Sequence, residues 1–160
     1  MTERHELRAY EYVTRPYETV KSVLRADPAG VLGRATHGAT TRAGDVAASL
    51  RASIGTLEVG TDVAIEVGAI EETVATRGGV VLRIPLAWRA AHAPAFFPSM
   101  KAVLSAYPLS KDETQLELVG TYTPPLGLLG DAVDGLALGR LADASVHRFV
   151  ADVAAYISKG

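Results

Sequence analysis

Length and composition limit what this chain can be. Its 160 residues are 48% hydrophobic and 21% charged, which excludes a disordered chain and provides enough sequence for one hydrophobic core. The formal net charge of −2 argues against a nucleic-acid partner, and the absence of cysteine excludes disulfides, thiolate metal sites and cysteine nucleophiles. We therefore expect one globular domain over residues 1–160, located in the cytoplasm.

Two segments are the candidates for a targeting or membrane segment, and both carry charges. The N-terminal residues 1–8 are charged from the third residue onward, so they contain no apolar signal core. The apolar stretch of residues 126–141 is interrupted by Asp131, Asp134 and Arg140, whereas a membrane span needs about 20 apolar residues with few charges. The sequence predicts no integral membrane segment.

The first part of the chain predicts a strand followed by two short helices. Residues 6–13 are rich in Tyr and Val, and Arg15-Pro16 ends this strand and opens a helix over residues 16–26. Asp27-Pro28 then breaks that helix and can open a second one over residues 31–35.

Alternation of apolar and polar residues, which is typical of strands with one buried face, dominates the middle of the chain. Its longest run contains Pro85, which cannot donate a ladder hydrogen bond, so we expect an edge position or a bulge there. Gly68 is expected at a bulge or turn, and Gly78-Gly79 in a hairpin turn. The predicted strands cover residues 46–54, 63–67, 70–76, 80–88, 100–109 and 114–122.

The last part of the chain predicts one long helix over residues 128–157. The residues on the side of this helix that should face the core are bulky in its C-terminal half. They are small in its N-terminal half, which contains Gly135 and Gly139. Glycine inside a helix costs roughly 0.5–1 kcal/mol relative to alanine. Three reasons remain open for these glycines: close packing on another backbone, room for a ligand, or a kink or break.

Antiparallel strands between helices grouped at the two ends of the chain predict an α+β fold. Several segments resemble the helix-grip (SRPBCC) superfamily of START-like domains, polyketide cyclases/aromatases and Bet v 1-like proteins. The resemblance is carried by residues 12–20 (YVTRPYETV), 86–91 (LAWRAA), 107–109 (YPL), 114–116 (TQL) and 122–127 (YTPPLG). Residues 145–150 (SVHRFV) are similar to the final helix of actinobacterial members.

This resemblance implies a curved antiparallel sheet of about six or seven strands around a long C-terminal helix, with two short helices after the first strand. It also implies a cavity between sheet and helix that takes apolar molecules. Because the fold hosts binding, transfer and catalysis alike, it does not decide the activity.

The candidate ligand-binding residues are those expected to face inward under the helix. They are Leu82, Ile84, Leu86 and Trp88 from the longest strand, Leu118 and Tyr122 from the last strand, and Gly135 and Gly139 from the helix. Trp88 and Tyr122 combine an apolar ring with a polar tip that can orient a ligand, although ordinary core packing is the other interpretation. Phe97, in a loop between prolines, is a candidate gate over the cavity, a membrane-touching tip or a plug.

Glu11 is a weak candidate for a catalytic acid or base, because alternation places it on the inward face of the first strand. A bulge that turns it outward or an arginine that pairs with it is the other interpretation. The four histidines, His5, His37, His92 and His147, lack metal-ligand spacing, so we expect neither a metal nor a cofactor.

Three functions follow as hypotheses. The first is binding of a hydrophobic or amphipathic small molecule in an internal cavity, for transport or sequestration. The second is a polyketide cyclase/aromatase-like enzyme that uses the same cavity, with Glu11 or a loop histidine steering proton transfer. The third is an interaction module that resembles the Hsp90-activator branch. A second apolar side of the final helix also suggests a homodimer.

Overall fold

The computed structural model of the chain describes residues 5–35, 63–76, 78–90, 99–123 and 135–159. A second helical segment, residues 28–35, follows the first helix, as predicted. The predicted strand over 46–54, the loop that holds Phe97, and residues 128–134 of the predicted helix lie outside the described residues. The elements in chain order are β1 (His5–Val13), α1 (Tyr17–Ala26), β2 (Val63–Val67), β3 (Glu71–Val74), β4 (Val80–Ala90), β5 (Ser99–Ser110), β6 (Glu113–Thr123) and α3 (Gly135–Lys159).

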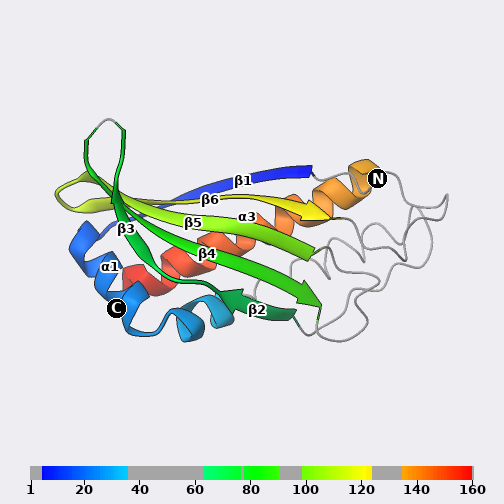
Figure 1. Ribbon diagram of the computed structural model, residues 1–160, viewed down its shortest axis with the longest axis horizontal. Coiled ribbons are helices and arrows are strands. Elements are labelled where there is room, and N and C mark those ends of the chain that lie inside the picture. Colours follow the sequence, from blue (N-terminus) through cyan, green and yellow to red (C-terminus); the bar gives the residue numbers. More distant parts are fainter. Residues whose placement is uncertain (1–4, 36–62, 77, 91–98, 124–134, 160) are drawn as a thin grey trace.

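The strands form one antiparallel sheet in which the first strand lies next to the last. The order is β1-β6-β5-β4-β2, and β3 pairs with β4 beyond the end of β2. The sheet is curved, and α3 runs obliquely across one of its faces while α1 lies at the end where α3 finishes (Figure 1). This is the α+β helix-grip arrangement that the sequence predicts.

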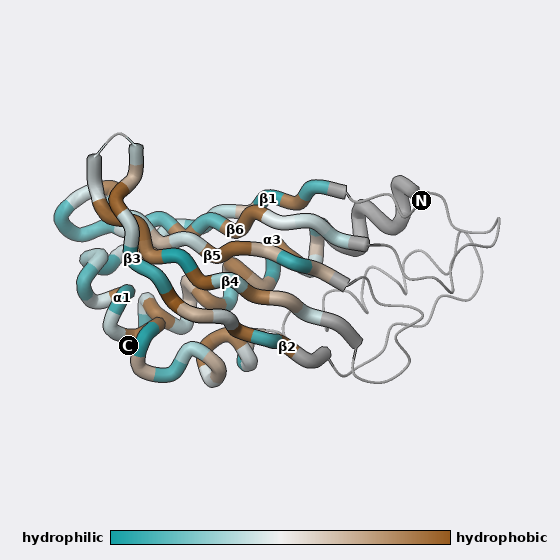
Figure 2. Tube along the Cα trace, in the orientation of Figure 1, coloured by the Kyte–Doolittle hydropathy of each residue, from teal (hydrophilic) through white to brown (hydrophobic). Residues whose placement is uncertain are grey.

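Each long strand has one buried face, which we call the inner face because α3 packs on it. In β4 the inner residues are Leu82, Ile84, Leu86 and Trp88, as predicted, and all four are buried. Figure 2 shows apolar positions interspersed with hydrophilic ones along the strands, as expected for a sheet with one buried side. The matching inner residues of the neighbouring strands are Met100, Ala102, Leu104, Ala106, Leu116, Leu118 and Tyr122.

The corner between β1 and α1 is fixed by a buried hydroxyl. Thr114, on β6, is fully buried, and its Oγ1 donates a hydrogen bond of 2.8 Å to the carbonyl oxygen of Arg15. Pro16 follows in an extended conformation, and its carbonyl accepts the first hydrogen bonds of α1. The side chain of Asp27 accepts a hydrogen bond from the Gly30 amide, which caps the second helical segment.

Of the two alternatives expected for Pro85, an edge position or a bulge, the structure shows an irregularity in the pairing, because β4 has strands on both sides but neither β2 nor β3 pairs with Pro85 itself. On one side Pro85 is paired with Val103 of β5. On the other side the neighbouring strand is interrupted between β2 and β3, where the Gly68 amide donates to the Pro85 carbonyl at 2.7 Å. The interruption at Gly68 therefore accommodates a proline inside the sheet, since no ladder bond is required of its nitrogen there.

The C-terminal half of α3 forms the centre of the core. The predicted stripe of Val146, Val150, Val153 and Ile157 is buried, and Phe149 is fully buried beside it. The helix is continuous from Gly135 to Lys159, so a break at Gly139 is excluded. Gly135 is the first described residue of α3. Close packing, room for a ligand and a kink remain as reasons for the two glycines.

Candidate functional site

Strand register groups the inner residues into rows that run across the sheet. The row nearest the beginning of α3 contains Ile65, Trp88, Met100 and Tyr122, from β2, β4, β5 and β6. Figure 1 shows the start of α3 at this end of the sheet. We call these four residues the terminal row, and it contains Trp88 and Tyr122, two of the three aromatic candidates from the sequence.

The terminal row rests on α3 through an aromatic contact. The rings of Trp88 and Phe149 meet edge to face, with centroids 5.2 Å apart and planes at 82°. Both side chains are buried, and this is a favourable geometry for two aromatic rings. Sequence analysis did not select Phe149, although its spacing from Val146 (i+3) and Val153 (i−4) places it on the core side of the helix.

Beyond this contact, toward the C-terminus of α3, the inner face is packed. Leu82, Ile84 and Leu118 are 0–1% exposed, and Leu86, Trp88 and Tyr122 are 3–4% exposed. All six predicted ligand-binding residues on the described strands are therefore buried. Trp88 and Tyr122 lie at the end of the inner face near the start of α3, and Leu86 is the inner residue before Trp88 on β4.

Tyr122 supplies a polar group in the terminal row. Its ring is almost fully buried, and burial raises the pKa of its hydroxyl, with a smaller contribution from the negative charge of Asp143 on α3. The phenol is therefore protonated at neutral pH, and a protonated phenol donates a hydrogen bond.

Gly135 and Gly139 lie in the part of α3 that extends past the aromatic contact. Gly139 is ten residues before Phe149, which corresponds to about 15 Å along a helix. The described helix thus continues from its bulky half, packed under Trp88, into a half that contains the two glycines.

Glu11 lies far from this row. Pairing of β1 with β6 is regular at nine positions, so no bulge turns Glu11 outward, and it stands opposite Leu116. Its side chain is half-buried at the inner rim. Six residues along β6 separate Leu116 from Tyr122, about 20 Å in an extended strand. The structure does not bring Glu11 and the aromatic residues together.

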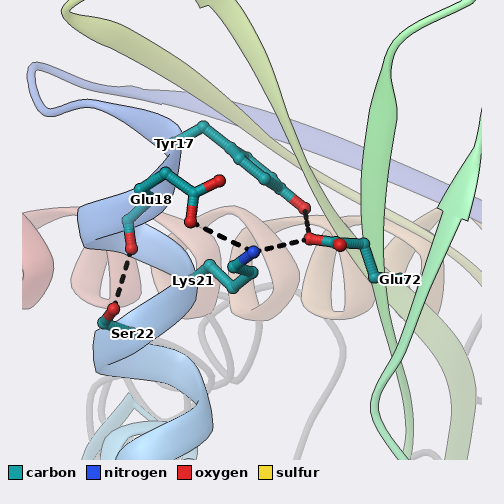
Figure 3. A network of polar contacts seen from close by, with 5 residues as sticks. All are labelled: Tyr17, Glu18, Lys21, Ser22 and Glu72. Atoms are coloured by element: carbon teal, nitrogen blue, oxygen red, sulfur yellow. Dashed lines mark hydrogen bonds and ion pairs between the residues drawn. The ribbon is translucent and has the colours of Figure 1, made fainter.

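The opposite end of the inner face is closed by a polar contact between α1 and β3, shown in Figure 3, which we call the α1–β3 clamp. The Tyr17 hydroxyl and the Lys21 ammonium both donate to Oε2 of Glu72, at 2.8 and 2.9 Å. These bonds lower the pKa of the Glu72 carboxyl. Burial and the bond to Glu72 raise the pKa of Tyr17. The clamp is an ion pair with a buried phenol, which fixes α1 against the edge of the sheet.

Several other expectations concern the surface. His147 is exposed on α3, next to Arg148, whose Nε is 3.1 Å from Asp152. Within the described ranges no three His, Cys, Asp or Glu residues gather as metal ligands. None of the described helices is long and apolar enough to cross a membrane. His37, His92 and Phe97 lie outside the described residues.

Comparison with known proteins supports the fold alone. No protein-family model and no curated protein matches the chain. Crystal structures of TTHA0849 from Thermus thermophilus and of a conserved protein from Geobacillus kaustophilus are similar, each with a TM-score of 0.51, at 15% and 16% identity. The alignments cover 96% and 97% of this chain, and 97% and 96% of those chains.

The Zhui aromatase/cyclase from a Streptomyces species is also similar, with a TM-score of 0.46 at 15% identity, over 98% of this chain and 95% of that chain. The chain shares with TTHA0849 and the Geobacillus kaustophilus protein the fold described above, a curved antiparallel sheet around a long C-terminal helix. At these identities the likeness shows a shared fold and assigns no activity.

Proposed function

We propose that the chain binds a hydrophobic or amphipathic small molecule between the terminal row and the glycine-containing half of α3. The observation that carries this proposal is the position of the Trp88–Phe149 contact. On one side of it the inner face and the helix are packed together, and on the other side the helix contains Gly135 and Gly139. A ligand seated there would contact Trp88 and Tyr122.

The chemistry of the terminal row favours a ligand with an apolar body and one hydrogen-bond acceptor. Ile65, Trp88 and Met100 offer apolar surface, and burial of about 300 Å² of ligand surface against such residues would contribute about 7 kcal/mol before the cost of association. The neutral phenol of Tyr122 is suited to donate to a carbonyl, hydroxyl or ether oxygen. Binding of this kind needs no covalent step.

The chain contains a single tryptophan and six tyrosines, so emission excited at a wavelength that only tryptophan absorbs reports on Trp88 alone. We would titrate the purified protein with anilinonaphthalene sulfonate, oleate and a tricyclic anthraquinone, and follow the emission of Trp88. The proposal predicts a saturable change with at least one probe. It is contradicted if the emission does not change in any titration.

A variant that fills the proposed site, compared with a control variant, provides a second test. Gly139→Phe adds a large side chain to the half of α3 proposed to face the ligand, whereas His147→Phe adds the same side chain at an exposed position of the same helix. We expect Gly139→Phe to weaken binding at least tenfold while the circular dichroism spectrum is retained, and His147→Phe to bind normally. Equal binding by the two variants would place the ligand elsewhere.

A further inference from the structure

A pocket lies where α1 meets the last turns of α3, at the other end of the helix from the terminal row. It has a volume of about 380 Å³ and is lined by Val23 of α1 and by Tyr156, Ile157 and Lys159 of α3. Figure 1 shows α1 beside this end of α3. Pockets that hold small molecules have volumes of about 300 to 1,000 Å³, so this one has room for a compact ligand.

The pocket offers apolar surface from both helices. Ile157 is fully buried, and Val23 is partly buried and packs against the core. Tyr156 stands beside them with 40% of its surface exposed. Aliphatic side chains next to an accessible aromatic ring are suited to the flat or aliphatic body of a small molecule.

Two cations border the ring of Tyr156. Arg34, in the helical segment of residues 28–35, places its guanidinium carbon 5.0 Å from the centre of the ring, a cation–π contact. Lys159 follows Tyr156 by three residues on α3, so the two side chains leave neighbouring positions on the helix surface. Both cations are exposed. Within the described part of the chain, neither has an acidic side chain at ion-pair distance.

The described acids nearest in sequence to the pocket residues are both engaged. Asp152 of α3 lies 3.1 Å from the Nε atom of Arg148. Asp27, directly after α1, accepts a hydrogen bond from the Gly30 amide and keeps its charge. Two cations against one acid without an ion pair leave these surroundings net positive. Such surroundings attract an anionic group.

We propose that this pocket binds a small apolar molecule that carries one carboxylate. Its body lies against Val23 and Tyr156, and its carboxylate lies between Arg34 and Lys159. A guanidinium has several N–H donors in one plane, which match the two oxygens of a carboxylate. Lysine adds a second charged donor.

This pocket is separate from the ligand site proposed above. Gly139 and Tyr156 are 17 residues apart on α3, which corresponds to about 25 Å along the helix. The inference therefore goes beyond the proposed function and does not depend on it. Either site can be occupied without the other.

Isoleucine methyl groups distinguish the two sites by NMR. The chain has five isoleucines, of which Ile157 lines this pocket and Ile65 belongs to the terminal row. We would label their δ1 methyl groups with carbon-13 and add 3-phenylpropionate up to about 20 mM, which covers millimolar affinities. The Ile157 signal should shift saturably. The uncharged 3-phenylpropanamide should bind at least about fivefold more weakly, as expected for the loss of exposed ion pairs.

An unmoved Ile157 signal, or equal affinity for the acid and the amide, would overturn the proposal. A shift of Ile65 alone would also overturn it, although that result would support the ligand site at the terminal row. The two failures are therefore distinguishable.

Substitution of the two cations tests the assignment of the carboxylate. Arg34→Gln/Lys159→Gln should bind 3-phenylpropionate about as weakly as the wild type binds the amide. Lys111→Gln, which removes an exposed cation in the turn between β5 and β6, is the matched control and should bind normally. Unchanged signals of the other isoleucines would show that each variant is folded. Wild-type affinity in Arg34→Gln/Lys159→Gln would overturn the proposal.

Discussion

The contact between Phe149 and Trp88 should dominate the stability of the inner core. Phe149 is fully buried, and its ring meets Trp88 edge to face at 5.2 Å. Removal of a buried phenylalanine ring costs about 3 to 5 kcal/mol through lost burial and the cavity left behind. Phe149→Ala should therefore lower the free energy of unfolding by about 4 kcal/mol, of which the aromatic geometry contributes about 1 kcal/mol.

Urea denaturation measures this loss, with Trp88 emission as the probe and circular dichroism as an independent one. Phe149→Leu keeps most of the volume and should cost only about 1 to 2 kcal/mol. Tyr156→Ala, at a position on the same helix that is 40% exposed, serves as the control and should cost less than about 1 kcal/mol. A loss below about 1 kcal/mol for Phe149→Ala would refute the claim that this half of the fold is closely packed.

Four further substitutions test other parts of the fold. A Cβ on Gly120 would meet the backbone of Lys101, so Gly120→Ala should destabilise by about 1 to 3 kcal/mol, while Gly33→Ala, in open space within a helical segment, should stabilise by up to about 1 kcal/mol in thermal unfolding. The pKa of Glu72 is lowered in the folded state, so its contribution to stability is full at neutral pH and is lost as the pH falls through the acidic range. The difference in unfolding free energy between wild type and Glu72→Gln should shrink from pH 7 to pH 3, and a constant difference would contradict the clamp. Thr114→Val removes the donor of the part-buried hydrogen bond to the Arg15 carbonyl and should cost about 1 to 2 kcal/mol in urea denaturation. An unchanged midpoint would show that the corner does not depend on this bond.

The pattern of apolar and polar residues predicted most of the helices and strands. An element with one buried face repeats its apolar residues at the period of its secondary structure, and this repeat is visible in the sequence. Alternation over Val80–Trp88 identified β4 and its four inner residues, and the glycine pair Gly78-Gly79 forms the turn before it, with φ values of 76° and 113°. Whether Pro85 lies on an edge strand or inside the sheet could not be derived from the sequence, because a proline shows only that its own nitrogen donates no backbone hydrogen bond. That the neighbouring strand breaks at Gly68, opposite Pro85, depends on contacts between strands.

The candidate site was predicted less completely than the fold. Alternation predicts which side chains of a strand point inward. Whether such a side chain contacts packed core or open space depends on which residues of α3 lie against it. Leu82, Ile84 and Trp88 therefore look equivalent in the sequence, and all three are buried in the structure, where the ring of Trp88 meets that of Phe149. Glu11 likewise faces inward as alternation requires, and only the register of β1 with β6 shows its distance from Tyr122.

The central claim is that a ligand lies against the terminal row, and two labels test it directly. The chain has one tryptophan and two methionines, Met1 and Met100, so an NMR spectrum with labelled methionine methyl and indole N–H groups is simple to assign. Saturating anilinonaphthalene sulfonate is predicted to shift the Met100 methyl and Trp88 indole signals, and Gly139→Phe to abolish both shifts. Saturable binding of the probe that leaves both signals unmoved would contradict the account.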